Sequence, residues 1–117
     1  MQIDVKGRHL TVTAELRDYA RKRFDKVSRQ VSELAQMEVE LCEERNPSNP
    51  DKHVVDVTLH LKGVTLRARE CSPRDMRHAI HLAEEDISRQ VKRHRDKRRR
   101  RREARSAAFG GGASPAV

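Results

Sequence analysis

Residues 53–71 read HVVDVTLHLKGVTLRAREC and carry the strongest structural signal in the chain. Apolar side chains occupy every second position on either side of Lys62-Gly63, a dipeptide that suits a tight hairpin turn. A period of two indicates a strand with one buried face. The pattern therefore predicts strands at about 53–61 and 64–71. The alternating apolar residues are Val55, Val57, Leu59, Leu61, Val64, Leu66 and Ala68.

The same alternation appears twice nearer the N-terminus. At 36–44 apolar residues alternate with glutamates, and a shorter run at 2–6 is expected to end before Gly7. Between the second and third strands, segment 45–51 (RNPSNPD) has two prolines among Asn, Ser and Asp, which favour turns. The sequence thus predicts four strands, with a loop in the middle.

Residues 14–31 change to helical spacing. Thr13 precedes them and suits the N-cap position, where a hydroxyl oxygen accepts a backbone N–H. At 100° per residue, Lys22, Lys26 and Arg29 share one flank of this helix. The apolar stripe consists of Leu16, Tyr19, Ala20, Phe24, Val27 and Val31.

A second helix is predicted to start at Ser72-Pro73, with Ser72 as the cap and Pro73 in the first helical position. The side chain of Asp75 is expected to reach back to the cap residue, as in a capping box. It is expected to continue through the arginine run and to fray near residue 105, before a flexible glycine-rich end. Its apolar stripe is Met76, Ala79, Ile80, Ala83, Ile87 and Val91. The basic residues predicted on the opposite side are Arg89, Lys92, Arg93 and Arg100.

The predicted order is β-α-β-β-β-α, and each element has one apolar face. The simplest way to bury these faces is an α+β fold: a four-stranded mixed sheet with two helices packed on one face. The helix between the first two strands allows a parallel crossover, and the other strands follow as an antiparallel meander. Both helices then present basic outer surfaces side by side.

The positive charge of the chain is concentrated at its C-terminal end. The chain has 26 Lys and Arg against 18 Asp and Glu, a net charge of +8. Residues 1–87 are nearly neutral, at −1, whereas residues 88–117 carry +9. Such a block attracts a polyanion, because binding releases condensed counterions. The alternative is a solvated tail that keeps the chain soluble.

An enzyme is not expected, because the residues that chemistry needs do not occur in suitable patterns. His78 and His81 belong to no metal-binding signature, and the acids at 84–86 point in different directions around a helix. No glycine-rich phosphate loop, metal site, cofactor or small-molecule substrate is predicted. Cys42 and Cys71 are expected to be free thiols on the polar face of the sheet, separated by a strand.

Composition also restricts where the protein is located in the cell and how it could recognise RNA. No apolar run is long enough for a membrane helix, and no signal peptide is recognisable, so a cytoplasmic location without membrane contact is expected. Aromatic residues make up only 3% of the chain, too few to stack many bases. RNA would therefore be recognised through its backbone and shape.

An ordered set of segments resembles the ribosome hibernation-promoting factor family, which includes ribosome-associated inhibitor A (protein Y). Asn46-Pro47-Ser48 is followed by VVDVTLHL, Gly63 and LRA; then come DMRHAI at 75–80 and RQVKRHRDK at 89–97. The resemblance covers roughly residues 1–97. The chain resembles the short form of the family, which is without the C-terminal dimerisation domain of the long members. It divides the chain into a ribosome-binding α/β domain, 1–97, and an Arg-rich helix extension with a flexible tail, 98–117.

The resemblance implies a function in translation. Members of the family bind small-subunit rRNA in the cleft between head and body, overlap the mRNA and A/P-site tRNA positions, block translation and protect idle ribosomes. The chain would be a monomer off the ribosome. Whether ribosomes pair, which signal induces expression and whether another factor assists all stay open. Family matches and helix geometry together give the candidate RNA-binding residues Lys22, Lys26, Arg29, Arg89, Lys92, Arg93, Lys97 and Arg100.

Two other functions fit the same residues. A general nucleic-acid-binding or transcription-modulating protein would also use the arginine run, and a protein–protein adaptor would use the exposed face of the sheet. Sedimentation with ribosomes separates these hypotheses, because only the hibernation factor is expected to migrate near-stoichiometrically with the small subunit or the whole ribosome.

Overall fold

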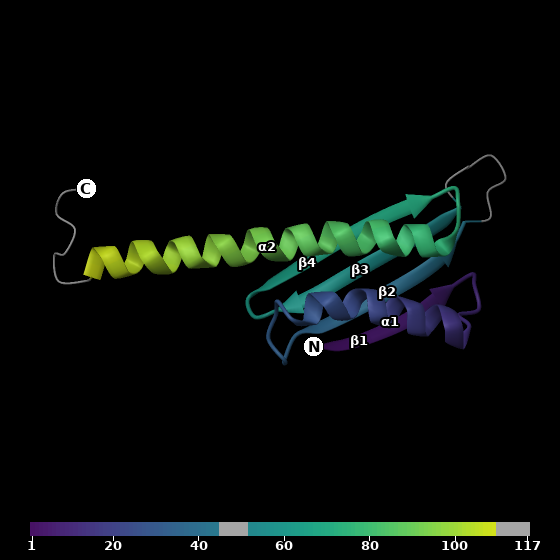
Figure 1. Cartoon of the computed structure of the whole chain (residues 1–117), viewed down its shortest axis with the longest axis horizontal. Coiled ribbons are helices and arrows are strands. Elements are labelled where there is room, and N and C mark those ends of the chain that lie inside the picture. The colour runs from purple at the N-terminus through teal and green to yellow at the C-terminus, as the bar shows by residue number, and fades with distance from the viewer. Residues whose placement is uncertain (45–51, 110–117) are drawn as a thin grey trace.

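Four strands and two helices form two layers in the computed structural model (Figure 1). The structure describes residues 1–44 and 52–109. The predicted loop at 45–51 and the glycine-rich end lie outside the described residues. The elements are β1 (Gln2–Arg8), α1 (Ala14–Ser28), β2 (Gln36–Glu43), β3 (His53–Leu61), β4 (Val64–Ser72) and α2 (Met76–Phe109).

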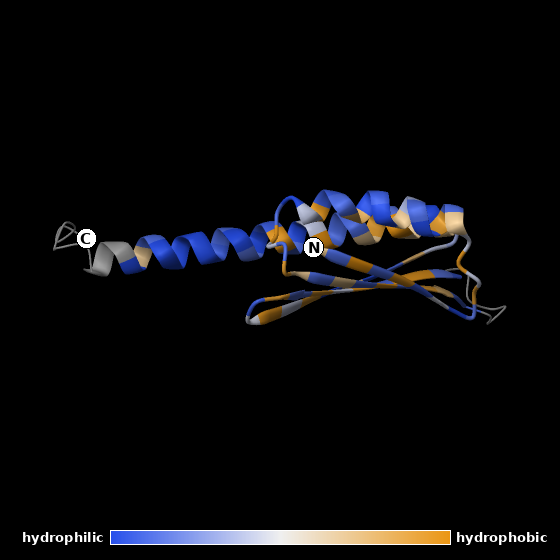
Figure 2. Cartoon of the chain, turned by 90° about the horizontal axis from the view of Figure 1, so that it is seen from below, coloured by the Kyte–Doolittle hydropathy of each residue, from blue (hydrophilic) through white to orange (hydrophobic). Residues whose placement is uncertain are grey.

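The strands form one mixed sheet in the order β1-β2-β3-β4. β1 pairs with β2 in parallel, and the other neighbours are antiparallel. Both helices lie on the same side of the sheet, and no described helix covers the opposite face (Figure 2). The predicted fold class, element order and helix placement are therefore confirmed.

The core lies between the sheet and the helices, where the two periodicities meet. On β2 the apolar residues are buried and the glutamates between them face the other side. Phe24 of α1 and Ile80 and Ile87 of α2 are completely buried against them. Removing one such side chain from water contributes about 1.5–3 kcal/mol. This shared core holds both helices on the sheet.

Helix α2 begins three residues later than the sequence predicts. Asp75 is the cap: its side-chain oxygen accepts the backbone N–H of His78 at 2.7 Å. Ser72 instead ends β4 opposite His53 and is fully buried, where its hydroxyl lies 2.7 Å from the His78 ring. Strand pairing therefore keeps Ser72 and Pro73 out of the helix, and the prediction that Ser72 caps it was wrong.

The other boundaries differ from the predictions by at most three residues, except that α2 continues to Phe109 rather than fraying near residue 105. Thr13 caps α1 as expected, accepting from the backbone N–H of Leu16 at 3.2 Å. The helix ends at Ser28, and Val31, expected inside it, packs against the core from the following segment. Strand β1 runs past Gly7 to Arg8, because its pairing with β2 continues.

Gly7 is required near the end of β1, where the segment that follows the strand folds back against it. A Cβ at this position would lie 2.4 Å from the carbonyl oxygen of Leu10, closer than atoms approach without a backbone shift. His9, in the same turn, has a φ of 58°, in the left-handed region that few non-glycine residues adopt. The turn is thus tight, and the small residue allows it.

The two cysteines carry free thiols, as predicted. Cys42 on β2 and Cys71 on β4 both pair in register with Val54 on β3, so β3 separates them. Two strand spacings amount to about 9.6 Å, beyond the reach of a disulfide.

Candidate nucleic-acid-binding surface

The two helices lie side by side and run in the same direction, so their C-terminal ends lie toward the same end of the molecule (Figure 1). The Arg77 guanidinium sits 5.0 Å from the centroid of the Tyr19 ring, an attractive cation–π geometry. Arg23 of α1 also contacts the Nδ1 atom of His81 on α2. These contacts fix which flank of each helix faces outward.

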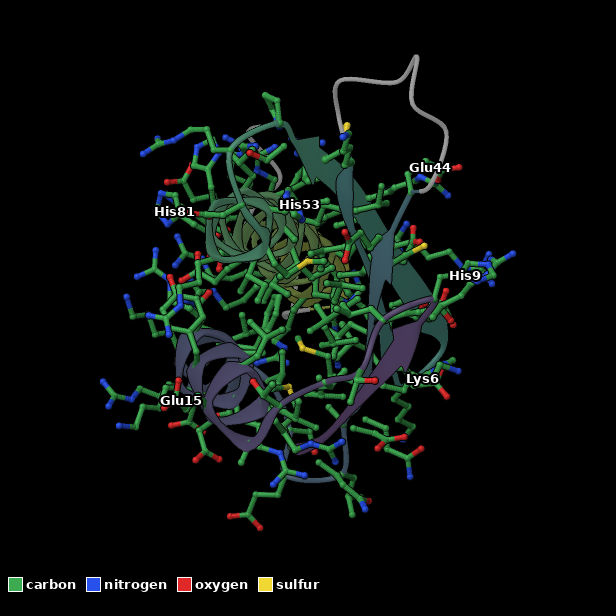
Figure 3. All side chains as sticks on the ribbon, turned by 90° about the vertical axis from the view of Figure 1, so that its right-hand side faces the viewer. Lys6, His9, Glu15, Glu44, His53 and His81 are labelled. Atoms are coloured by element: carbon green, nitrogen blue, oxygen red, sulfur yellow. The ribbon has the colours of Figure 1, made fainter. Side chains whose placement is uncertain are left out.

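A hydrogen-bond chain extends from this contact. Arginine only donates, so Nδ1 of His81 accepts from Arg23 and its Nε2–H donates to Glu85 at 2.7 Å. Figure 3 shows His81 and Glu15 on the helix side of the molecule, with Lys6 on the side of the sheet. The outer helix surface and the open sheet face are therefore two separate surfaces.

All eight predicted RNA-binding residues are exposed. Lys22 and Lys26 project from α1, and Arg29 occupies its C-cap. The other five lie on α2: Arg89, Lys92, Arg93, Lys97 and Arg100. Within the part of the chain that the structure describes, none of the eight has a carboxylate within 4.0 Å. Their charges are thus available to an anionic partner at small desolvation cost.

The charges are distributed unevenly along the helices. Acids accompany the bases in the first halves, with Glu15 and Asp18 on α1 and residues 84–86 on α2. From residue 89 onward, α2 carries basic residues with only Asp96 and Glu103 among them. The positive potential is therefore concentrated where the helices end; this region, formed by Lys26, Arg29 and α2 from Arg89 on, is called the basic end.

Helix α2 continues well past the sheet (Figure 2). Val91 is its last buried residue, and all residues from 97 to 105 are exposed. Residues 98–109 form a projection, called the arginine arm, about 18 Å long at 1.5 Å per residue. Among the described side chains, the arm has one ion pair, between Arg99 and Glu103 at 3.6 Å.

A groove of about 310 Å³ lies where the arm leaves the domain, and it is called the arm-root groove. The segment after α1 and the β3–β4 turn form one wall, and α2 forms the other. Its lining includes Val31, Leu61, Val91, Arg95, Arg98 and Arg102. His94 and Arg99 of α2 also line it, so the α2 lining recurs at helical spacing from Val91 and continues the buried stripe with basic residues in place of apolar ones.

Sequence reasoning missed these arginines, although their signal was present. Arg95, Arg98 and Arg102 were not among the eight predicted RNA-binding residues. Extending the helical phase from Val91 would have placed them on the face that turns toward the domain.

The open sheet face has a different electrostatic character. Lys6 lies 3.9 Å and Arg8 4.0 Å from Glu40, and Arg69 lies 3.7 Å from Asp56. Pairing in register places Lys6 opposite Glu40 and Arg69 opposite Asp56. Alternation along the strands places four bases and four acids on this face, and His60 lies beside Glu38. The eight residues are Lys6, Arg8, Arg67, Arg69, Asp4, Glu38, Glu40 and Asp56. This face attracts a polyanion far less than the basic end.

One titratable group behind the helices is perturbed. Burial raises the pKa of the Glu70 carboxyl, and a hydrogen bond with Asp86 raises it further. Gln90 donates to Asp86 at 3.1 Å and to the backbone carbonyl of Arg67 at 2.7 Å. This cluster fastens α2 to β4, and the nearby charge of Arg89 opposes part of the rise in the pKa of Glu70.

Across 1–44 and 52–109, no group of three or more His, Cys, Asp or Glu side chains could hold a metal ion. No helix in the same residues is long and apolar enough to cross a membrane.

Comparison with known proteins agrees with the fold and covers most of the chain. Ribosome hibernation promoting factor from Salmonella typhimurium is 30% identical over 97 residues, spanning 83% of this chain and 96% of the relative. The factor from Acinetobacter guillouiae is 28% identical over 100 residues, or 81% and 88%.

Among solved structures, the N-terminal domain of Thermus thermophilus Protein Y superposes with a TM-score of 0.69 at 28% identity, over 80% of this chain and 98% of that one. A ribosomal subunit interface protein from Coxiella burnetii shares the fold, with a TM-score of 0.67 at 20% identity over 82% and 99%. The model of the Sigma 54 modulation protein / S30EA ribosomal protein family matches residues 3–99. The chain therefore belongs to this family.

Proposed function

We propose that this protein is a ribosome hibernation factor without catalytic activity. Its basic helix surface binds small-subunit rRNA in the cleft between head and body, where it overlaps the positions of mRNA and of A- and P-site tRNA. Translation is thereby blocked and the idle ribosome protected. The protein acts in the cytoplasm and is a monomer off the ribosome.

The observation that carries this proposal is the contrast between the two faces. The helix face has exposed bases without a described carboxylate partner, whereas bases and acids are equal in number on the sheet face. In protein–DNA complexes about half to two-thirds of the hydrogen bonds go to the phosphates and sugars, and Arg and Lys are among the usual donors. The similarity to proteins named as ribosome hibernation promoting factors supports the ribosome as the source of the RNA.

The eight residues have distinct proposed roles. Lys22, Lys26 and Arg29 contact one rRNA backbone segment from α1, and Arg89, Lys92 and Arg93 contact another from α2. Lys97 and Arg100 extend that second contact along the arm. Residues 1–97 act as the ribosome-binding domain, and the arm adds affinity to it.

Sedimentation tests the proposal. The full chain is mixed with purified small subunits, whole ribosomes or large subunits and centrifuged through a gradient. Near-stoichiometric migration with small subunits and whole ribosomes, and none with large subunits, is the expected result. Inhibition of a cell-free translation reaction at the same protein ratio checks the block.

A second function, modulation of transcription, is favoured by one observation: the family description also contains the words Sigma 54 modulation protein. The arginine arm would bind DNA through the same charges. Competition distinguishes the two. If duplex DNA displaces the protein from small subunits at equal phosphate concentration, the ribosome is not its preferred partner and the hibernation proposal fails.

A further inference from the structure

We propose that the arm-root groove binds one unpaired nucleotide of an RNA strand. The base lies against the apolar lining, and the neighbouring phosphates pair with arginines of α2. This inference rests on the proposed RNA-binding function and adds to it a site that reads a base, where the helix surface contacts only backbone.

The inner lining of the groove is apolar. Val91 is buried in the core, and Val31 and Leu61 pack against the core from two other segments. A purely phosphate-binding surface has no use for such a lining, because apolar area gains nothing from an ionic partner. A volume of about 310 Å³ is at the small end for organic ligands, which suits a base with its sugar.

The outer lining is cationic and planar. Arg95, Arg98 and Arg102 follow one another at spacings of three and four on the helix face that borders the groove. A guanidinium group stacks on a base and donates two hydrogen bonds to a phosphate. Tyr19 is engaged with Arg77 and Phe24 is buried, so neither ring is available to stack a base. The arginines provide the stacking surfaces instead, with the ring of His94 beside them in the lining.

The chemistry favours a nucleic-acid strand over an acidic peptide. Both could neutralise three arginines, and both could place an apolar group in the groove. The positive charge, however, continues along the arm through Arg98 to Arg102 and on to Arg105, over about 11 Å of helix. A strand with one charge per nucleotide matches that continuous row, and a peptide with scattered acids does not.

The test compares two strands of equal length and charge: a short oligouridylate and the same phosphodiester chain without bases. Fluorescence anisotropy with the full chain is expected to show the base-bearing strand binding at least about fivefold tighter, from the stacking of one base. The double variant Arg98→Ala/Arg102→Ala should abolish this preference. Arg100→Ala/Arg101→Ala removes the same charge from side chains that do not line the groove, and it should keep the preference while weakening both strands equally.

Several outcomes would overturn the inference. Equal affinity for the two strands would mean that the groove reads phosphates alone. A preference that survives in Arg98→Ala/Arg102→Ala would place the base elsewhere. Uridine monophosphate competing as well as the strand would indicate a free nucleotide as ligand, and a tighter acidic peptide of equal charge would indicate a protein. Because the measurement contains no ribosome, failed sedimentation would contradict the proposed function without affecting this result.

Discussion

Neutralising two exposed bases of α2, Lys92→Gln/Arg93→Gln, gives the sharpest test of the helix surface. Both side chains are exposed, and neither has a carboxylate partner within 4.0 Å among the described residues. The change should therefore alter stability by at most a few tenths of a kcal/mol, as usual for surface substitutions. Any effect on binding then reflects lost contacts with the ribosome.

The size of the effect follows from counterion release. Each phosphate contact contributes about 0.7–0.9 to the slope of log K against log salt concentration. Losing two contacts should make that slope shallower by about 1.4–1.8. Relative to a 1 M reference, affinity at 0.1 M salt should fall by roughly 25- to 60-fold.

Binding to labelled small subunits, measured by anisotropy over a series of salt concentrations, gives both quantities. The matched control is Arg67→Gln/Arg69→Gln, which removes the same net charge from the open sheet face. The control should retain a slope close to that of the unmodified protein. If the two variants lose affinity and slope equally, net charge rather than the helix surface governs binding, and the reasoning from the two faces is wrong.

Three further predictions concern the fold. Ile80→Ala should lower the free energy of unfolding by about 2–5 kcal/mol in denaturant titrations, because Ile80 is completely buried; a loss below 1 kcal/mol would contradict the core. Gly7→Ala should cost about 1–3 kcal/mol, because its Cβ would meet the Leu10 carbonyl oxygen 2.4 Å away; unchanged thermal melting would show that the turn is looser. Burial and the Asp86 hydrogen bond raise the pKa of Glu70, so the folded state holds this proton more tightly than the unfolded state does. The resulting contribution to the free energy of unfolding is fully present below about pH 4.5 and decreases as pH rises through the folded-state pKa. Glu70→Gln should make that decrease smaller. An unaltered profile of stability against pH would exclude the Glu70 carboxyl as its cause.

Most of the fold could be predicted because each element carries its own periodicity. The alternation in 53–71 gave β3 and β4 to within one residue, and the stripe ending at Val91 gave the buried face of α2. Local patterns suffice wherever one face of an element is buried, since the burial itself imposes the period. The Lys62-Gly63 turn was equally local, with Gly63 at a φ of 78°.

The start of α2 could not be predicted in the same way. Ser72 and Asp75 are both good capping residues three positions apart, and local chemistry does not choose between them. The choice depends on how far β4 pairs with β3, which is a tertiary property. Val31 illustrates the same limit: its apolar side chain fits the helical phase, yet it reaches the core from beyond the helix end.

The exposure of the basic side chains on the candidate surface could be predicted from the sequence. The contacts between the elements that carry these side chains could not. Helical phase placed Lys92 and Arg93 outward, and the structure agrees. Which flank of α1 meets α2 depends on contacts such as Arg23 with His81, between residues 58 positions apart. The arm-root groove requires three separate segments to converge, so no period within one segment could reveal it.

The continuity of α2 has a consequence for how quickly a partner is found. The last base of the arginine arm, Arg105, lies about 12 Å past Lys97, more than one Debye length at physiological salt, so these charges meet the field of a polyanion before the domain does. Such steering raises association rates, in favourable cases by tenfold to a thousandfold. Because the same helix is anchored in the core through Ile80 and Ile87, a pull on the arm also rotates the domain. The first contact, made by the arginine arm, thus orients the domain before the domain itself binds the partner.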